Sequence, residues 1–533
     1  MKKTLSIILV LMMLVCSSAI AVAEAPTFKN TDIYPLEGDH TITMTTSFLE
    51  EVDEYPILEA FGEATGVKID VKVIDKEQTP LLYAGKKSEV PELYFTTSGK
   101  AGVSLDQIRE YGMAGYIINY ADYLDQMPNL KAAIERDDNV LNYVVNEDGS
   151  FYTLPHICST LTQAGPAYYI REDHMKLAGW ETAPATIEEF EQFLRDLQAY
   201  FGPNDPLYIP FTVANTGVIG FSGRLTEAFF TFFGDLLEPS LTTTNGGTEI
   251  AVGFATEQYK RFVTYFHKLY ADKLLDNECF TTDDAYIKTF LADGHTSVNY
   301  NMSSMLPAHF PSGNLDLIMP APLTSEWQPE KRYFIPDKYS WWCSLVGAET
   351  PNLDAILAFL DSLYATEENP IDEEGTLWGA CFWLGKYGRD WEWREEDRSS
   401  YNLLIPEGYT NRNDYLDGTY FLNGPYVSDL ISVEYNEYGS FKPKAVEVQK
   451  NLYPYGVSTV RTAWLQLTED ENDTYVDAWS DIKTYVTQMH AAFITGEADI
   501  EAEWDNYLKE LDSMGLQDVI DVYQAALDRF NAR

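Results

Sequence analysis

The sequence lacks the common signatures of hydrolysis, nucleotide binding and metal catalysis. It contains no GxSxG nucleophile turn, no HExxH zinc helix, no GxxxxGK[ST] phosphate loop, no GxGxxG motif and no CxxC pair. Histidine and cysteine are scarce, with 7 and 5 residues in a chain of 533. The cysteines are widely spaced, which argues against a zinc framework, and a chain of this length needs no disulfide scaffold. The sequence therefore predicts neither a cofactor nor a bound metal.

Positive charge is also scarce. The chain has 37 Lys and Arg residues against 83 Asp and Glu residues, a formal net charge of −46 and a pI of about 4.3. It contains no run that is rich in Lys and Arg. Because nucleic acids and anionic membrane surfaces are bound through basic patches, we expect neither as a partner.

Long apolar runs are missing except at the N-terminus. There, two lysines precede an apolar core at 5–15, which is too short to cross a bilayer, and 21–23 offers a small-x-small cleavage site. We expect residues 1–23 to be a signal peptide and the mature protein to be exported, to the extracellular space or the cell envelope. The alternative is lipid attachment at Cys16, which would tether the protein to the outer face of the cytoplasmic membrane. Val15 stands where such a site normally has a small residue.

Apolar sequence is abundant enough for more than one core, because 45% of the residues are hydrophobic and 14% aromatic. From His40 on, strand-like and helix-like patterns alternate, and apolar residues occupy every second position in 67–73. This alternation indicates α/β layers with a largely parallel sheet, in which ligands bind beyond the carboxyl ends of strands. Thr45–Ser47 and Thr96–Ser98 follow predicted strands, and we interpret them either as cleft linings or as plain polar loops.

Helical spacing recurs in the remaining sequence. Thr186–Glu189 is a capping box, and 259–270 and 353–364 keep the spacing of helices with one apolar face. Three helices are predicted after residue 479. Between these parts, 366–455 is irregular and rich in Trp, Tyr, Gly, Asn and Asp, which is typical of a functional loop or an insertion.

A turn and two short strands between Val144 and Asp173 indicate that the chain passes there from one lobe to another. The alternative is a hairpin within one domain. Ser297–Asn301 is the expected return crossing. The predicted lobes are therefore discontinuous, the first comprising 24–165 and about 300–395, the second 166–299 and about 396–533.

Since catalytic and metal-binding motifs are missing, a binding site in this chain is expected to consist of aromatic and polar side chains. Sugars present apolar C–H faces and a rim of hydroxyl groups, so they require flat rings beside hydrogen-bonding groups. Since strand side chains alternate between faces, one of two adjacent strand tryptophans is expected in the core. For His156, the alternative is a packed structural role without ligand contact. The candidate ligand-binding residues are Thr97, Ser98, His156, Tyr300, Asn301, Trp341, Trp342 and Trp378.

Eight segments, in order along the chain, carry a family resemblance. They are Phe61–Val67, Val90–Leu93, Asp148–Pro155, Tyr169–Asp173, Pro184–Phe190, Lys268–Asp276, Ala355–Tyr364 and Thr495–Leu516. Together they resemble the extracellular solute-binding proteins of ABC importers, in the sugar-associated family typified by maltose-binding protein and its larger Gram-positive lipoprotein relatives. The chain departs from that family at Glu92, where relatives usually have Asp, and in 366–455, where no segment can be aligned.

The resemblance implies a fold and a function. The fold is α/β and two-lobed, of the type II periplasmic-binding-protein kind, each lobe with a mixed, mostly parallel sheet flanked by helices and with further helices at the C-terminus. The function is a non-enzymatic, monomeric receptor that captures a mono- or oligosaccharide between the lobes and delivers it to an ABC permease in the membrane. Two alternatives stay open: a secreted glycoside hydrolase, because 83 acidic residues offer many carboxylate pairs, and a surface carbohydrate-binding or adhesin protein without a transport role.

Overall fold

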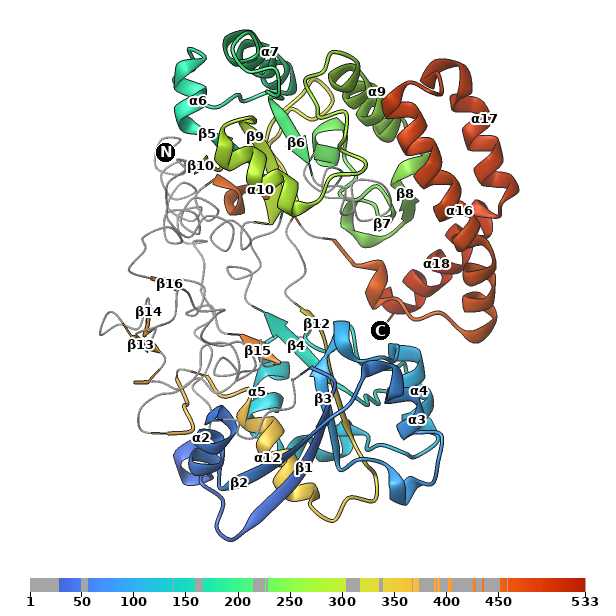
Figure 1. The fold of residues 1–533 in the computed structure, drawn as a ribbon. Coiled ribbons are helices and arrows are strands. Elements are labelled where there is room, and N and C mark those ends of the chain that lie inside the picture. Colours follow the sequence, from blue (N-terminus) through green and yellow to red (C-terminus); the bar gives the residue numbers. More distant parts are fainter. Residues whose placement is uncertain are drawn as a thin grey trace, which may run out of the picture.

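The computed structural model shows two lobes, the first below the second in Figure 1. Residues 1–27, which include the predicted signal peptide and Cys16, lie outside the described residues, as do Trp378 and most of 366–455. The residues that the structure describes are 28–48, 56–137, 139–158, 166–213, 226, 229–302, 317–334, 339–366, 368–372, 388–389, 391–393, 401–404, 425–427, 434–435, 451–457 and 459–532.

The first lobe contains a six-stranded sheet in the order β15-β4-β12-β3-β1-β2. Its strands are β1 (His40–Thr46), β2 (Val67–Val73), β3 (Leu93–Thr97), β4 (Leu154–Cys158), β12 (Tyr339–Val346) and β15 (Tyr426–Val427). The sheet is parallel except at β12, which runs antiparallel to both β3 and β4. Its helices are α2 (Pro56–Thr65), α3 (Thr79–Leu82), α4 (Leu105–Met113), α5 (Pro128–Arg136) and α12 (Leu353–Ser362).

The second lobe is built on a four-stranded mixed sheet in the order β10-β5-β9-β6. Its strands are β5 (Pro166–Arg171), β6 (Phe211–Val213), β9 (Val298–Met302) and β10 (Leu317–Ile318). Four helices accompany the sheet: α6 (Glu172–Leu177), α7 (Ile187–Phe201), α9 (Glu257–Ala271) and α10 (Asp284–Asp293). A hairpin of β7 (Leu241–Thr243) and β8 (Ile250–Val252) and the pair β11 (Tyr333–Phe334) and β17 (Gly456–Val457) complete it.

Three C-terminal helices pack on the second lobe: α16 (Glu469–Thr495), α17 (Ile500–Ser513) and α18 (Leu516–Asn531). Apolar residues of all three belong to the same buried core as those of α7 and α9. They lie at the outer side of this lobe, and the chain ends beside the first lobe (Figure 1). A small sheet of β13 (Trp391–Trp393), β14 (Tyr401–Leu403) and β16 (Glu434–Tyr435) comes from the irregular region.

Local sequence explains several element boundaries. The predicted alternation of β2 appears as alternating burial, with Val67 and Ile69 in the core. The Thr186 hydroxyl caps α7 by accepting from the Glu189 amide at 3.1 Å, while the Glu189 carboxylate accepts from the Ala185 amide. The first crossing strand, β4, begins at Leu154, after the turn that contains Gly149.

The return to the first sheet also comes later than the sequence indicated. β9 contains Asn299 and Asn301, which we expected at the return crossing, but it pairs with β5 and β6 within the second sheet. β10 pairs with β5 as well. The chain rejoins the first sheet at Tyr339, the first residue of β12, and not near residue 300.

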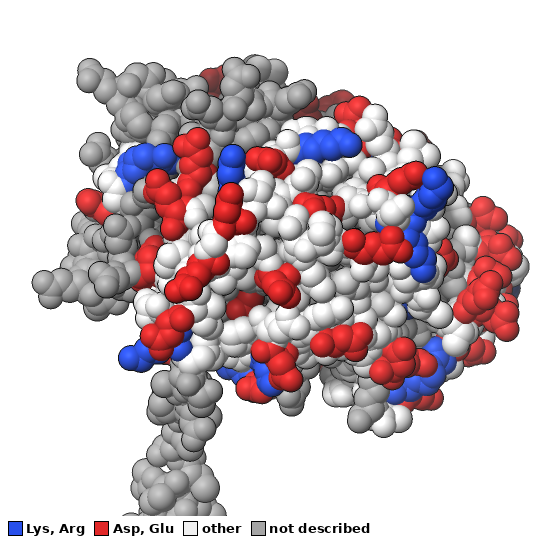
Figure 2. Space-filling model, turned by 90° about the horizontal axis from the view of Figure 1, so that it is seen from below, with Lys and Arg blue, Asp and Glu red and all other residues white. Residues whose placement is uncertain are grey.

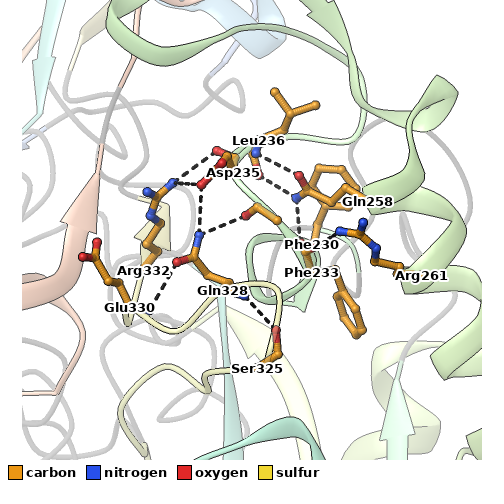
Figure 3. A network of polar contacts seen from close by, with 11 residues as sticks. Phe230, Phe233, Asp235, Leu236, Gln258, Arg261, Ser325, Gln328, Glu330 and Arg332 are labelled. Carbon is orange, nitrogen blue, oxygen red and sulfur yellow. Dashed lines mark hydrogen bonds and ion pairs between the residues drawn. The ribbon is translucent and has the colours of Figure 1, made fainter.

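A polar network fixes the segment at and after Phe230–Phe233, a short aromatic-rich turn of the second lobe (Figure 3). The buried Gln258 amide donates to the carbonyl oxygens of Phe230 and Leu236, both at 2.9 Å, and accepts from the Leu236 amide at 2.9 Å. On the other side, Gln328 donates to the Gly234 carbonyl oxygen at 3.2 Å, and Arg332 forms an ion pair with Asp235 at 3.3 Å. The backbone from Phe230 to Leu236 is therefore held by side chains on two sides.

Two general properties bear on function. None of the helices in the described part of the chain is both long and apolar enough to cross a membrane. Figure 2 shows the face that includes the first lobe, where Asp and Glu side chains are widely scattered and Lys and Arg are fewer. On this face the acidic residues are thus spread out and not gathered in one patch.

The buried carboxyl group of Asp361, at the end of α12, makes the stability of the first lobe depend on pH. Its carboxylate is buried and accepts from the Asn129 side chain at 2.8 Å and from the Leu130 amide at 2.9 Å. Burial raises the pKa of Asp361 to about 7. An unfolded Asp titrates near pH 4, so the folded state binds more protons between about pH 4 and 7, and this group makes stability fall as pH rises through that window.

We therefore expect Asp361→Asn to remove a pH dependence of up to about 4 kcal/mol between pH 4 and 7. The measurement is urea unfolding at several pH values, comparing the slopes of stability against pH and not the absolute stabilities. Asp354→Asn, at an exposed position of the same helix, is the matched control and should keep the wild-type slope. An Asp361→Asn variant with an unchanged slope would contradict the assignment.

Candidate ligand-binding site

Five of the predicted site residues lie at one edge of the first sheet. Thr97 ends β3 and Ser98 follows it, while His156 is on β4 and the two tryptophans are on β12. The register places Trp342 opposite Thr97 on one side and Leu154 on the other. His156 lies opposite Ser340 in the same ladder. The strand pairing therefore brings these segments together at neighbouring positions of the sheet.

Burial separates these five residues into two groups. Trp342 is only 3% exposed and belongs to the first core, with its ring 5.7 Å from that of Phe95 and 5.4 Å from that of His156. His156 Nδ1 is 2.9 Å from Ser340 Oγ, and burial lowers the pKa of His156 to about 4, which keeps the ring uncharged at neutral pH. His156 is half-buried, and so are Thr97, Ser98 and Trp341. Trp342 is thus the core member of the tryptophan pair.

The other predicted residues are not part of this group. Tyr300 is fully buried in the core of the second lobe, opposite Tyr168 and Val213, so its expected place in a cleft is wrong. Asn301 follows it on β9, opposite Ala167. Trp378 lies outside the described residues.

A cavity of about 490 Å³ lies between the lobes, and sequence reasoning missed it. Its first-lobe wall consists of α4 and the segment that leads into β4. Its second-lobe wall consists of the approach to α16, α16 itself and α18. Side chains that line it include Arg109, Asn146 and Tyr152 from the first lobe, and Trp464, Tyr475 and Tyr523 from the second.

The first-lobe wall is organised around α4. Arg109 Nε donates to Asn146 Oδ1 at 2.8 Å, which ties this helix to the turn before β4. Gly112 of α4 lets the ring of Tyr152 pack directly on the helix backbone, because a Cβ atom at this position would lie 2.2 Å from that ring. Gly149 in that turn has a φ of +83°, as the predicted reversal requires. Tyr152 is therefore held against α4 and lines the cavity.

Aromatic rings dominate the second-lobe wall. The rings of Tyr475 and Tyr523 meet edge to face, with their centroids 5.3 Å apart. Trp464 packs edge to face against Tyr143 of the first lobe at 6.2 Å. One aromatic contact therefore bridges the two lobes beside the cavity.

A clasp of polar contacts, defined here as Gln466, Arg529, Glu471, Glu147 and the Val145 carbonyl, joins the lobes at the same place. Gln466 Nε2 donates to the Val145 carbonyl oxygen. The Arg529 guanidinium binds both carboxylate oxygens of Glu471, at 2.8 and 2.6 Å, and reaches Glu147 of the first lobe at 3.2 Å. The hydrogen bond from Arg529 lowers the pKa of Glu471. The cavity is thus closed on one side by contacts that would have to break if the lobes separated.

The chemistry of the cavity is that of recognition. It combines aromatic faces with amide, hydroxyl, guanidinium and carboxylate groups, the set that a hydroxylated ring compound needs. Among the described residues there is no group of His, Cys, Asp or Glu side chains that could hold a metal ion.

The sequence carried partial signals for these residues. Tyr152 stands in the segment after the Asp-Gly turn, and Tyr475 lies four residues before Trp479, on the apolar stripe of a helix that was expected to start later. Neither residue is among the predicted site residues, because nothing in their spacing shows that a third segment would leave a cavity beside them.

No protein-family model matches the chain. A relative in Streptococcus pneumoniae serotype 4, the fructooligosaccharide ABC transporter substrate-binding protein FusA, is 22% identical over 552 residues, covering 96% of this chain and 94% of the relative. The structure of S. pneumoniae FusA in complex with kestose matches with a TM-score of 0.70 at 20% identity, over 92% of this chain and 99% of that one.

Other solved structures agree on the fold. An extracellular solute-binding protein from Bifidobacterium longum subsp. infantis matches with a TM-score of 0.70 at 17% identity, over 93% of this chain and 99% of that one. The alginate-binding protein AlgQ2 matches with a TM-score of 0.64 at 17% identity over the same shares. These matches confirm the two-lobed type II fold and the resemblance that the sequence segments indicated: along nearly its whole length, the chain is similar to sugar-binding proteins of ABC importers and has their fold.

Proposed function

We propose that this protein is the extracytoplasmic solute-binding receptor of an ABC transporter and captures an oligosaccharide between its two lobes for delivery to a membrane permease. The observation that carries the proposal is the cavity of about 490 Å³, lined by aromatic and hydrogen-bonding side chains from both lobes. A ligand that contacts both lobes at once stabilises the arrangement in which they are close, which is how such a receptor signals occupancy.

The ligand that the site favours is an uncharged saccharide. Described side chains at the cavity include the carboxylates of Asp106, Glu110 and Glu469 beside the single guanidinium of Arg109. The chain as a whole carries a net charge of −46. A polyanionic saccharide would be repelled at both levels. A neutral fructooligosaccharide, the class named for the relative FusA, meets no such repulsion.

The cellular context follows from the same proposal. We infer export through cleavage after Ala23, with lipid attachment at Cys16 as the alternative, and a monomer that docks on its permease. We propose that the described residues of 166–334 and 451–532 belong to the second lobe, and that the segment from Tyr339 through α12 belongs to the first; the strand pairing supports these limits. The receptor is favoured over the glycoside hydrolase because the similar proteins are named for binding and transport.

The first test is thermal stabilisation by a panel of neutral and anionic oligosaccharides. A saccharide at about 100 times its Kd adds about 2.7 kcal/mol to folded-state stability, which we expect to raise Tm by roughly 2 °C or more. Neutral fructooligosaccharides should give the shift, anionic saccharides of equal length should not, and chromatography should recover the sugars intact. Shifts with peptides but with no saccharide would reject the sugar ligand, and released reducing ends would point to the hydrolase.

The second test removes one aromatic wall. Tyr152→Leu takes away a ring that lines the cavity, and we expect the Kd for the stabilising saccharide to rise by roughly tenfold, since an aromatic platform contributes about 1 kcal/mol or more. Isothermal titration calorimetry measures the change. Tyr200→Leu, at a 47% exposed position of α7 away from the cavity, is the control. Equal affinities for the two variants would show that the ligand binds elsewhere.

The third test concerns the clasp. Arg529→Gln breaks the two-oxygen contact with Glu471 and the link to Glu147, so we expect the ligand-free lobes to separate and the radius of gyration in small-angle X-ray scattering to increase. Arg195→Gln is matched, because Arg195 also binds two carboxylates, Glu191 and Asp272, but entirely within the second lobe. An unchanged radius of gyration for Arg529→Gln, or the same increase for Arg195→Gln, would contradict a role in holding the lobes together.

A further inference from the structure

A second, smaller cavity of about 300 Å³ adjoins the one between the lobes. It lies within the second lobe, between the segment that enters β7, the approach to α16, and the helices α16 and α18. Tyr475 and Tyr523 line both cavities. The edge-to-face pair of these two rings is therefore a wall that the two cavities share.

The smaller cavity has the surfaces that a sugar ring needs. The ring centroids of Trp479 and Tyr475 are 5.5 Å apart, and the two rings are inclined by 33°. The aromatic wall therefore continues along α16 beyond the pair of tyrosines that both cavities share. Ser240 and Thr462 stand on the other sides and carry hydroxyl groups. Aromatic faces next to hydroxyl groups complement the apolar face and the polar rim of a pyranose or furanose ring.

Charge in the smaller cavity is compensated. Glu238 is the acidic residue on its wall, and it forms an ion pair with Arg461 at 3.0 Å. The Arg461 guanidinium in turn lies 4.1 Å above the ring of Phe334, another wall residue. Burial raises the pKa of Glu238 although Arg461 is adjacent. A neutral ligand unit is consequently favoured over a charged one.

The wall is also held in place before any ligand arrives. The Gln258 network fixes the backbone up to Leu236 (Figure 3). Ser240 is tied through its carbonyl oxygen to the Gly253 amide at 3.0 Å, and a Cβ atom at Gly253 would lie 2.4 Å from the Glu238 carbonyl oxygen. Thr243 Oγ1 donates to the Val460 carbonyl oxygen at 2.9 Å, which joins β7 to the segment before Thr462. A preorganised wall lowers the entropic cost of binding.

We propose that the smaller cavity is a subsite for a further unit of a neutral oligosaccharide whose first units occupy the cavity between the lobes. The inference rests on the proposed function. The smaller cavity stands at the lower limit of the range of about 300 to 1,000 Å³ that is usual for ligand pockets, so it suits one unit of a longer chain. The protein thereby selects saccharides by length, with Tyr475 and Tyr523 between consecutive units.

The experiment is calorimetry with a fructooligosaccharide series of increasing length. In the wild type, affinity should rise at least tenfold between the shortest saccharide that binds and one that fills both cavities. Ser240→Phe places a ring in the smaller cavity, so the affinity for the shortest saccharide should persist while the gain with length is lost. Thr462→Phe does the same from another wall and covers the case in which Ser240→Phe does not fold, as judged by circular dichroism.

Ser480→Phe, at an exposed position of α16 outside both cavities, is the matched control and should keep the wild-type dependence on length. The inference is overturned if the wild type binds all lengths equally, or if a folded Ser240→Phe or Thr462→Phe keeps the gain. Those results leave the receptor function standing. If no saccharide of any length binds the wild type, the proposed function fails, and the subsite fails with it.

Discussion

The two lobes have separate hydrophobic cores, and the rest of the structure depends on that separation. One core is built from residues of the first sheet, α2, α5 and α12, and the other from the second sheet together with α7, α9 and the C-terminal helices. None of the described residues belongs to both. Because each lobe buries its own apolar surface, the space between them can be lined by rings and polar groups, and the lobes can change their spacing without exposing a core.

A small set of side-chain contacts joins the two lobes. Beside the strands that carry the chain across, the described contacts include one edge-to-face pair, Tyr143 with Trp464, and the clasp centred on Arg529. Partly exposed ion pairs contribute little to stability individually. A few such contacts can bias an open–closed equilibrium by an amount that a bound ligand can exceed, which suits a receptor that has to release its cargo.

The sequence was informative about elements and about the fold. Alternation in β2, the cap of α7 and the apolar stripes of α9 and of the C-terminal helices are local signals, and local physics decides them. The return crossing was misplaced because β9 has an ordinary strand pattern, and a strand pattern does not state which sheet the strand joins. That decision depends on partners far away in the chain.

The site was predictable by residue type but not by position. Tyr300 and Trp342 have the aromatic character that a sugar site needs, yet both are buried, and burial follows from packing that spacing does not reveal. The cavity between the lobes is lined by α4 on one side and by α16 and α18 on the other. These helices are more than 300 residues apart in the chain. Only the assembled fold shows that Tyr152 and Tyr475 face a common space. The aromatic wall then continues along α16 into the second lobe, which relates the shape of the site to ligand length.

The central claim is that a saccharide binds between the lobes and contacts both. The most direct measurement is a crystal structure of the protein with the neutral oligosaccharide that stabilises it most. The account predicts sugar density between Arg109 and Tyr152 on one side and Trp464 and Tyr475 on the other, with the clasp intact. Density that contacts one lobe alone, or that lies away from this cavity, would contradict it.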